Sequence, residues 1–70
     1  MPFPVVLMII PSGNNGWDLG NTKTITFNNK SKAEFFAQYY TGKNDCLVRY
    51  YTGNIWRATY CKGKQIWNCY

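Results

Sequence analysis

The sequence contains no histidine and only three acidic residues, Asp18, Glu34 and Asp45. General acid–base catalysis ordinarily uses histidine or a pair of carboxylates, and a cysteine nucleophile ordinarily needs a histidine base. No glycine-rich stretch is followed by the Lys-Ser or Lys-Thr that opens the helix of a phosphate-binding loop. We therefore expect a non-enzymatic protein that carries no cofactor.

Metal-binding and export patterns are also missing. The three cysteines form no CxxC pair, and without histidine they do not supply the four ligands of a zinc site, so we expect no metal. The apolar run 5–10 is too short to span a membrane, and neither a basic segment nor a small-residue cleavage pattern accompanies it. An intracellular protein and a mature extracellular form therefore both remain open.

What the chain does contain is aromatic and basic. Its 70 residues suit a single domain, 1–70, and 46% hydrophobic with 19% aromatic residues is too apolar for a disordered chain. The net charge of +5 arises entirely from residues 30–70, which hold seven bases and two acids. Such asymmetry indicates an anionic ligand, such as nucleic acid, an acidic lipid surface or an acidic protein, although it also suits the solubility of an apolar chain.

One segment has the pattern of a helix. Ser31 and Glu34 match a capping box, in which each side chain bonds the backbone of the other residue. Aromatic residues follow with spacings of four, and Gly42 stands where a glycine often ends a helix. We predict a helix over about residues 32–41 whose four rings, those of Phe35, Phe36, Tyr39 and Tyr40, pack in the core.

The remaining segments have strand patterns. Residues 5–10 and 22–27 precede the helix, and the runs 46–51, 55–61 and 65–70 follow it with short glycine turns between them. The predicted fold class is α+β: a small antiparallel sheet of order β-β-α-β-β-β, with one helix packed on a face and a C-terminal three-stranded meander.

The register of the first predicted hairpin has consequences. If Gly53 and Asn54 form a two-residue loop, Tyr50 lies opposite Arg57 and Cys46 lies opposite Cys61. Directly paired strand residues lie close enough for a disulfide, so we predict a Cys46–Cys61 bridge; the alternative is that both thiols remain reduced.

Alternation along the strands then divides the meander into two faces. With Gly63 and Lys64 as the second loop, the bulkier face is predicted to pack beneath the helix: Leu47, Arg49, Tyr51, Trp56, Ala58, Tyr60, Trp67 and Cys69. The other face is predicted to be partly exposed. It supplies our candidate binding residues, together with two lysines of the turn: Tyr50, Arg57, Asn68, Tyr70, Lys62 and Lys64.

Three function classes fit these features. We favour an extracellular binding protein of antimicrobial, toxin-like or glycan-binding type, which uses an aromatic and cationic sheet face on an anionic or glycan surface. The alternatives are a module that stacks single-stranded nucleic acid, and a protein-binding inhibitor of the kind made by phages or pathogens. The basic residues are dispersed along the chain, which weakens the nucleic-acid alternative.

Overall fold

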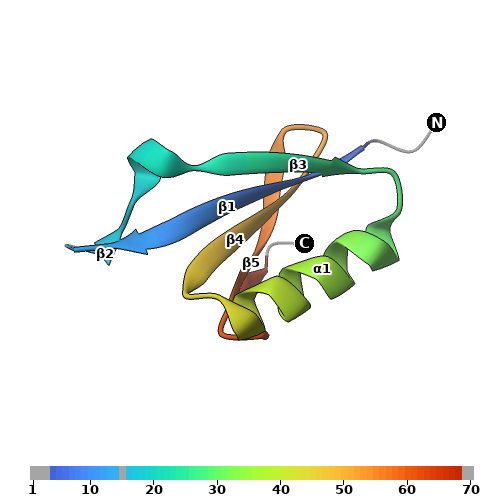
Figure 1. Cartoon of the computed structure of the whole chain (residues 1–70). Coiled ribbons are helices and arrows are strands. Elements are labelled where there is room, and N and C mark those ends of the chain that lie inside the picture. Colours follow the sequence, from blue (N-terminus) through green and yellow to red (C-terminus); the bar gives the residue numbers. More distant parts are fainter. Residues whose placement is uncertain (1–3, 15, 69–70) are drawn as a thin grey trace.

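The computed structural model describes residues 4–14 and 16–68 and has one helix packed against an antiparallel sheet (Figure 1). The fold class predicted from the sequence is confirmed, with one very short strand added near the N-terminus. The elements follow one another as β1 (Val5–Gly13), β2 (Gly16–Trp17), a 3₁₀ turn η1 (Leu19–Asn21), β3 (Lys23–Phe27), α1 (Lys30–Lys43), β4 (Cys46–Thr52), β5 (Ile55–Cys61) and β6 (Lys64–Asn68).

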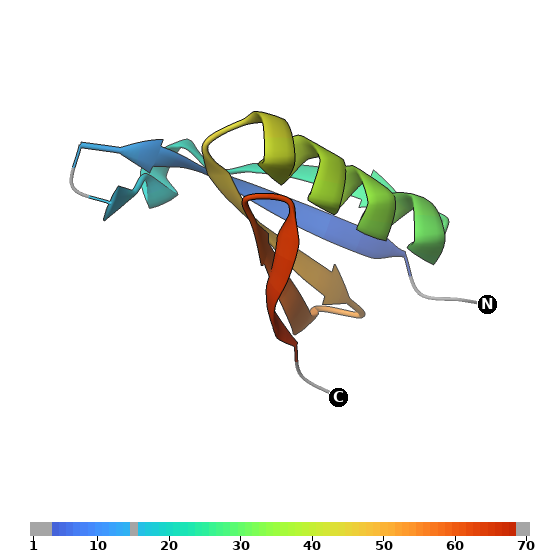
Figure 2. The same cartoon turned by 90° about the horizontal axis from the view of Figure 1, so that it is seen from below.

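The apolar first strand lies at the centre of the sheet. β1 pairs with β4 along one side and with both β2 and β3 along the other, and the path continues through β5 to β6, which is an edge. α1 crosses the face formed by β1, β4 and β5 (Figure 2). The fully buried Leu7 and Val48 lie beneath it, so the most apolar run of the sequence becomes the core.

The helix begins two residues earlier than the capping pattern predicted and ends later. Asn29 is the N-cap, and its side-chain oxygen accepts a hydrogen bond of 3.0 Å from the backbone N–H of Lys32. Gly42 lies inside the helix, and Asn44 follows it as the C-cap. The expected Ser31 cap is therefore wrong, and Glu34 has no capping role.

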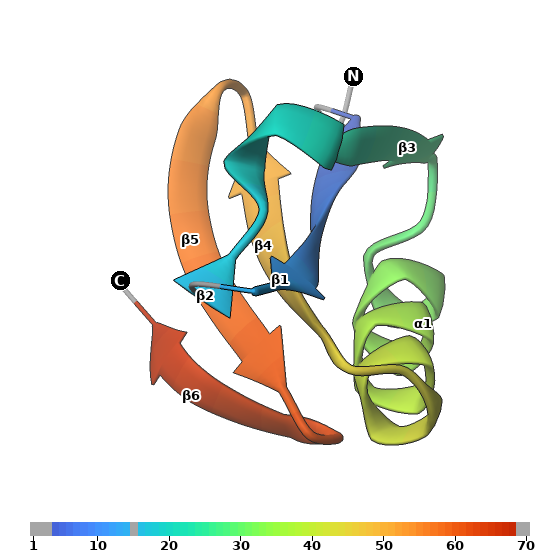
Figure 3. The same cartoon turned by 60° about the vertical axis from the view of Figure 1, so that its left-hand side comes forward.

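Gly42 is part of a close contact between the helix and the β5–β6 turn (Figure 3). A Cβ atom built on Gly63 would lie 3.4 Å from the Cα of Gly42. The backbone N–H of Gly63 also donates a 3.0 Å hydrogen bond to the hydroxyl of the buried Thr41. Gly42 therefore lies inside the helix, in contact with the hairpin turn, and does not end the helix.

Small side chains allow the helix to approach the sheet. The residues that α1 buries are Ala33, Ala37 and Thr41, spaced four apart. Of the four rings predicted to lie in the core, only those of Phe36 and Tyr40 pack against the buried core residues. The ring centroids of Phe36 and Phe27 are 5.4 Å apart.

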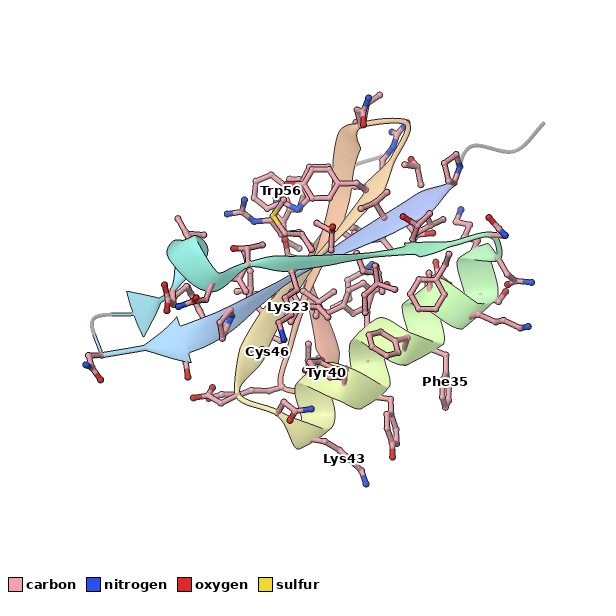
Figure 4. The ribbon with its side chains drawn as sticks, turned by 45° about the horizontal axis from the view of Figure 1, so that its top comes forward. Lys23, Phe35, Tyr40, Lys43, Cys46 and Trp56 are labelled. Atoms are coloured by element: carbon pink, nitrogen blue, oxygen red, sulfur yellow. The ribbon has the colours of Figure 1, made fainter. Side chains whose placement is uncertain are left out.

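The other two rings of the helix lie on its outer side, which corrects the prediction. Phe35 is 68% exposed and Tyr39 is 53% exposed. Their rings stack 6.0 Å apart, and the Lys43 ammonium lies 5.0 Å from the Tyr39 ring centroid. Figure 4 shows Phe35 and Lys43 directed away from the sheet, whereas Tyr40 points toward it. At about 100° per residue, Phe36 and Tyr40 lie beside the buried stripe of the helix, whereas Phe35 and Tyr39 lie on the opposite side.

A bulge changes the register predicted for the first hairpin. Thr52 pairs with Ile55 and Tyr51 with Trp56, as predicted, but Tyr50 then pairs with Ala58 because Arg57 is an extra residue in β5. The predicted Tyr50–Arg57 pair is therefore wrong. Every pair beyond the bulge also shifts by one residue, so that Leu47 rather than Cys46 lies opposite Cys61.

The second hairpin also differs from its predicted register. Cys61 pairs with Lys64, so the loop is Lys62-Gly63 rather than Gly63-Lys64. Both loop residues have positive φ, 53° and 78°, as a type I′ hairpin turn requires. A second irregularity follows at Ile66, since Tyr60 pairs with Gln65 and Thr59 with Trp67.

Candidate functional site

The face of the sheet opposite α1 is covered by no helix of residues 4–14 and 16–68 and carries a cluster of tryptophans. Figure 4 shows Trp56 on the far side of the sheet from the helix. A groove with a volume of about 310 Å³ lies on this face. We call its lining residues the Trp face: Trp17, Leu47, Arg49, Trp56, Thr59, Ile66 and Trp67.

All three tryptophans of the chain belong to the Trp face and remain partly exposed. Trp17 and Trp67 are each 43% exposed, and Trp56 is 38% exposed. As predicted, Trp56 and Trp67 share one face with Leu47 and Arg49, but the prediction places that face beneath the helix. That placement is wrong, because the helix covers the face that carries Val48, Tyr50, Ala58 and Tyr60.

Hydrogen bonding and ring contacts hold Trp56 in place. Its indole N–H donates to the backbone carbonyl of Ala58 at 3.0 Å and to the hydroxyl of Thr59 at 2.9 Å. Its ring centroid lies 4.7 Å from that of Trp67, and the Arg49 guanidinium carbon lies 4.4 Å from it on a ring face. The cluster is a fixed aromatic surface with a cation built into it.

Trp17 reaches this surface from a distant part of the sequence. The two-residue strand β2 pairs back on the end of β1, with Ser12 opposite Trp17 and Gly13 opposite Gly16. Gly16 has a φ of +114°, which side chains rarely adopt, so the turn itself requires glycine there. The turn residues that surround Trp17 thus bring it to the meander's tryptophans.

A second depression lies on the helix side of the sheet and gathers three of the predicted binding residues. It has a volume of about 300 Å³ and lies between the first turns of α1 and the strands β4, β5 and β6. We call it the helix-side cleft. Its lining consists of Lys30, Glu34, Tyr50, Thr52, Arg57, Ala58, Tyr60, Gln65 and Asn68.

Tyr50, Arg57 and Asn68 thus share one cleft although their predicted register was wrong. Tyr50 lines it from β4, and Arg57 lines it as the bulged residue of β5. The guanidinium Nε of Arg57 donates a 3.1 Å hydrogen bond to the hydroxyl of Thr52. Asn68 pairs with Ala58 in the register and reaches the cleft from the edge strand.

The other predicted residues lie elsewhere. Lys62 is in the β5–β6 turn and Lys64 opens β6; both are exposed, and neither is among the described residues that line the two depressions. Tyr70 lies outside the described residues. The structure therefore brings Tyr50, Arg57 and Asn68 together and places these two lysines outside their cleft.

The two cysteines predicted to form a disulfide are free thiols in the structure. Cys46 is buried on the helix side, whereas Cys61 is half-buried and pairs with Leu47. Burial, followed by the neighbouring Cys61 and Asp45, raises the pKa of the Cys46 thiol. The direct opposition from which we predicted the bridge is absent because of the Arg57 bulge.

The residues that the sequence analysis missed as a surface are Trp17, Trp56, Trp67 and Arg49. One signal was available: an arginine among residues assigned to the core contradicts burial, because an unpaired guanidinium is rarely buried. Arg49 shared its predicted face with both meander tryptophans. The presence of Arg49 therefore indicates that the face with the two meander tryptophans is exposed rather than buried.

Other kinds of site find no support within the described ranges. Among residues 4–14 and 16–68, no group of three or more histidine, cysteine or acidic side chains is placed to hold a metal ion. In the same part of the chain, no helix is long and apolar enough to cross a membrane. Comparison of the chain with protein-family models, curated proteins and solved structures gives no match.

Proposed function

We propose that this protein is a non-enzymatic binding protein that attaches to anionic lipid surfaces through its Trp face. The observation that carries the proposal is the gathering of all three tryptophans around one groove on the uncovered side of the sheet. Tryptophan side chains favour the headgroup level of a bilayer, where an apolar ring meets polar surroundings. This function agrees with the antimicrobial or toxin-like class predicted from the sequence.

Charge favours the same partner. The net charge of +5 draws the molecule toward a negatively charged surface, with a contribution of about 1 kcal/mol for each lysine or arginine close to that surface. The bases are spread over the helix, the strands and the turns rather than aligned in a track. A dispersed distribution suits an extended anionic surface better than a single phosphate chain, which requires a continuous basic groove.

The protein carries its own reporter for this proposal. Because every tryptophan belongs to the Trp face, intrinsic tryptophan emission reports on that face alone. Vesicles with phosphatidylglycerol should shift the emission to shorter wavelength as the rings leave water, and vesicles of phosphatidylcholine alone should do so weakly. Added salt should reduce binding to the anionic vesicles, since it screens the charges.

A matched pair of substitutions assigns the contact to one side of the molecule. Trp67→Ala removes an exposed ring from the Trp face, and Phe35→Ala removes one from the outer side of α1. In vesicle co-sedimentation, Trp67→Ala should weaken partitioning by roughly fivefold to tenfold, corresponding to part of an aromatic side chain's transfer free energy. Phe35→Ala should leave partitioning unchanged.

Two results contradict the proposal. If the protein ignores anionic vesicles at low salt, or if Phe35→Ala weakens partitioning as much as Trp67→Ala does, the Trp face is not a lipid-binding surface. An emission shift with a single-stranded oligonucleotide, in the absence of one with vesicles, would instead support the stacking of bases beside Arg49. Circular dichroism of each variant shows that its fold is retained.

A further inference from the structure

The helix-side cleft contains a hydroxyl group that the fold leaves unused. Tyr50 is 3% exposed, and its phenolic oxygen is buried with no hydrogen-bond partner among the described residues. Burial, followed by the proximity of Glu34 and Tyr60, raises the pKa of Tyr50 to about 12, so the group remains a neutral O–H at physiological pH. A buried hydroxyl without a partner is unfavourable because it has lost its hydrogen bonds to water, so such a group calls for an explanation.

The lining of the cleft carries charges of both signs. Lys30 and Arg57 contribute two positive charges and Glu34 one negative charge to the lining of the cleft. Since Asn29 caps the helix, the Glu34 carboxylate is not committed to the capping box. Arg57 is oriented through its Nε bond to Thr52, which leaves the terminal NH₂ groups of the guanidinium to bind a ligand.

Two amides complete the polar lining. The side-chain NH₂ of Asn68 donates to the oxygen of Gln65 at 3.3 Å, and the NH₂ of Gln65 donates to the hydroxyl of Tyr60 at 3.3 Å. Each NH₂ has two hydrogens, so each amide retains one donor after making this hydrogen bond. The cleft therefore combines a fork-shaped cation, a carboxylate, amides and a hydroxyl within one small volume.

We propose that the helix-side cleft binds an acidic sugar, a single pyranose ring that carries a carboxylate. Arg57 and Lys30 bind the carboxylate, because a guanidinium matches its two oxygens. Glu34 accepts hydrogen bonds from sugar hydroxyls, which a simple inorganic anion lacks. Tyr50, Gln65 and Asn68 offer further partners for such hydroxyls. A volume of about 300 Å³ is at the small end for ligand pockets, which suits one ring rather than a chain.

This site is independent of the proposed membrane contact, because it lies on the other side of the sheet. The two sites share none of their lining residues. Substitutions in one leave the other intact, so the two proposals succeed or fail separately.

The test is titration of the ¹⁵N-labelled protein with sodium glucuronate, followed by NMR. The side-chain NH₂ signals of Asn68 and Gln65 and the Nε–H signal of Arg57 should shift together in a saturable manner. Glucose, which has the same ring without the carboxylate, should bind at least tenfold more weakly. Acetate, which has the carboxylate without the ring, should also bind at least tenfold more weakly.

Three variants locate the binding. Arg57→Gln should weaken glucuronate binding at least tenfold, and Tyr50→Phe should weaken it by about twofold to tenfold, the range of one net hydrogen bond. Trp67→Ala, on the opposite face, should bind glucuronate as the unmodified protein does. The urea-unfolding midpoint of each variant is measured first, so that loss of binding is separated from loss of fold.

Several outcomes overturn the inference. Equal binding of glucuronate and acetate would make the cleft a general anion site, and equal binding of glucuronate and glucose would remove the role of its cations. Tighter binding of glycine than of glucuronate would make it a zwitterion site. The absence of saturable shifts at these three side chains, or unchanged binding in both Arg57→Gln and Tyr50→Phe, would show that no sugar is bound in the cleft.

Discussion

The two faces of the sheet are both rich in aromatic residues, but they use them differently. On the helix side, Tyr50 and Tyr60 are buried beneath α1 and contribute to the core. On the other side, the Trp face leaves its rings partly exposed around an apolar groove. The difference shows that ring content does not decide burial in this protein. Burial follows the position of the one helix, because a single helix covers only one face of a sheet.

The bulges decide which side chains reach each face. Beyond Arg57 the register shifts by one, which puts Tyr60 opposite Val48 on the helix side and Thr59 opposite Arg49 on the Trp face. A regular ladder would have placed these residues on the opposite faces. An extra residue in a strand exchanges the faces of all that follow, since side chains alternate with a period of two.

The largest expected loss of stability comes from removing a buried side chain on the helix side of the sheet. Leu7→Ala should lower the free energy of unfolding by about 2–5 kcal/mol, because Leu7 is fully buried and its loss leaves a cavity. Ile66→Ala, on the Trp face, removes the same number of carbons from a side chain that is 59% exposed and should cost about 0.5 kcal/mol or less. Urea unfolding measures both. Equal losses would contradict the difference in burial between the faces.

A smaller effect tests the contact that joins the helix to the β5–β6 turn. Gly63→Ala should destabilise by about 1–3 kcal/mol, chiefly because Gly63 has a φ of +78°, while a Cβ there would also contact the Cα of Gly42 at 3.4 Å. Gly42→Ala is the matched control and should stabilise by up to about 1 kcal/mol, because Gly42 is helical and a Cβ there meets only an ordinary contact at 3.6 Å. Thermal or urea unfolding should show a lower stability for Gly63→Ala and a higher stability for Gly42→Ala. The same sign for both variants would mean that the contact is not as the structure places it.

The next effect tests where the covering helix begins. Asn29→Ala should cost about 1 kcal/mol, because it removes the acceptor of the Lys32 backbone N–H. Ser31→Ala should change the free energy of unfolding by less than about 0.5 kcal/mol, since Ser31 is an exposed residue of the first turn. The two variants differ only in which residue caps the helix. A larger loss from Ser31→Ala would restore the capping box predicted from the sequence.

The smallest expected change in stability at neutral pH concerns the buried hydroxyl of the helix-side cleft. Tyr50→Phe should leave the free energy of unfolding unchanged within about 0.5 kcal/mol or raise it, because the hydroxyl that it removes has no partner among the described residues. A loss above about 1 kcal/mol would mean that this hydroxyl is bonded in the folded protein.

Alkaline pH separates Tyr50→Phe from the unmodified protein. The pKa of Tyr50 rises from 10 to about 12 on folding, so between these values the unfolded chain loses the phenolic proton before the folded protein does. The unmodified protein should therefore lose stability as pH rises from about 10 to about 12, and the variant should lack this part of the loss. The measurement is urea unfolding at several alkaline pH values. Parallel pH profiles would contradict the raised pKa.

Much of the architecture was predictable because it depends on local signals. The run 5–10, the glycine turns of the meander and the polar start of the helix predicted the element order, since hairpin turns and helix caps act within a few residues. The faces were not predictable, because the sequence does not mark the bulges at Arg57 and Ile66. Gly42 was wrongly predicted to end the helix, because the hairpin turn against which it packs is distant in the sequence.

The candidate site shows the same division. The sequence by itself determined an antiparallel α+β fold, a cationic C-terminal half and the absence of histidine, because these follow from composition and local pattern. Only the tertiary structure decided that Trp17 joins Trp56 and Trp67 on the open face, and that Lys30 and Glu34 meet Tyr50, Arg57 and Asn68 across the cleft. The physical reason is that both sites join segments distant in the chain. Their meeting depends on the strand register and on which face the helix covers.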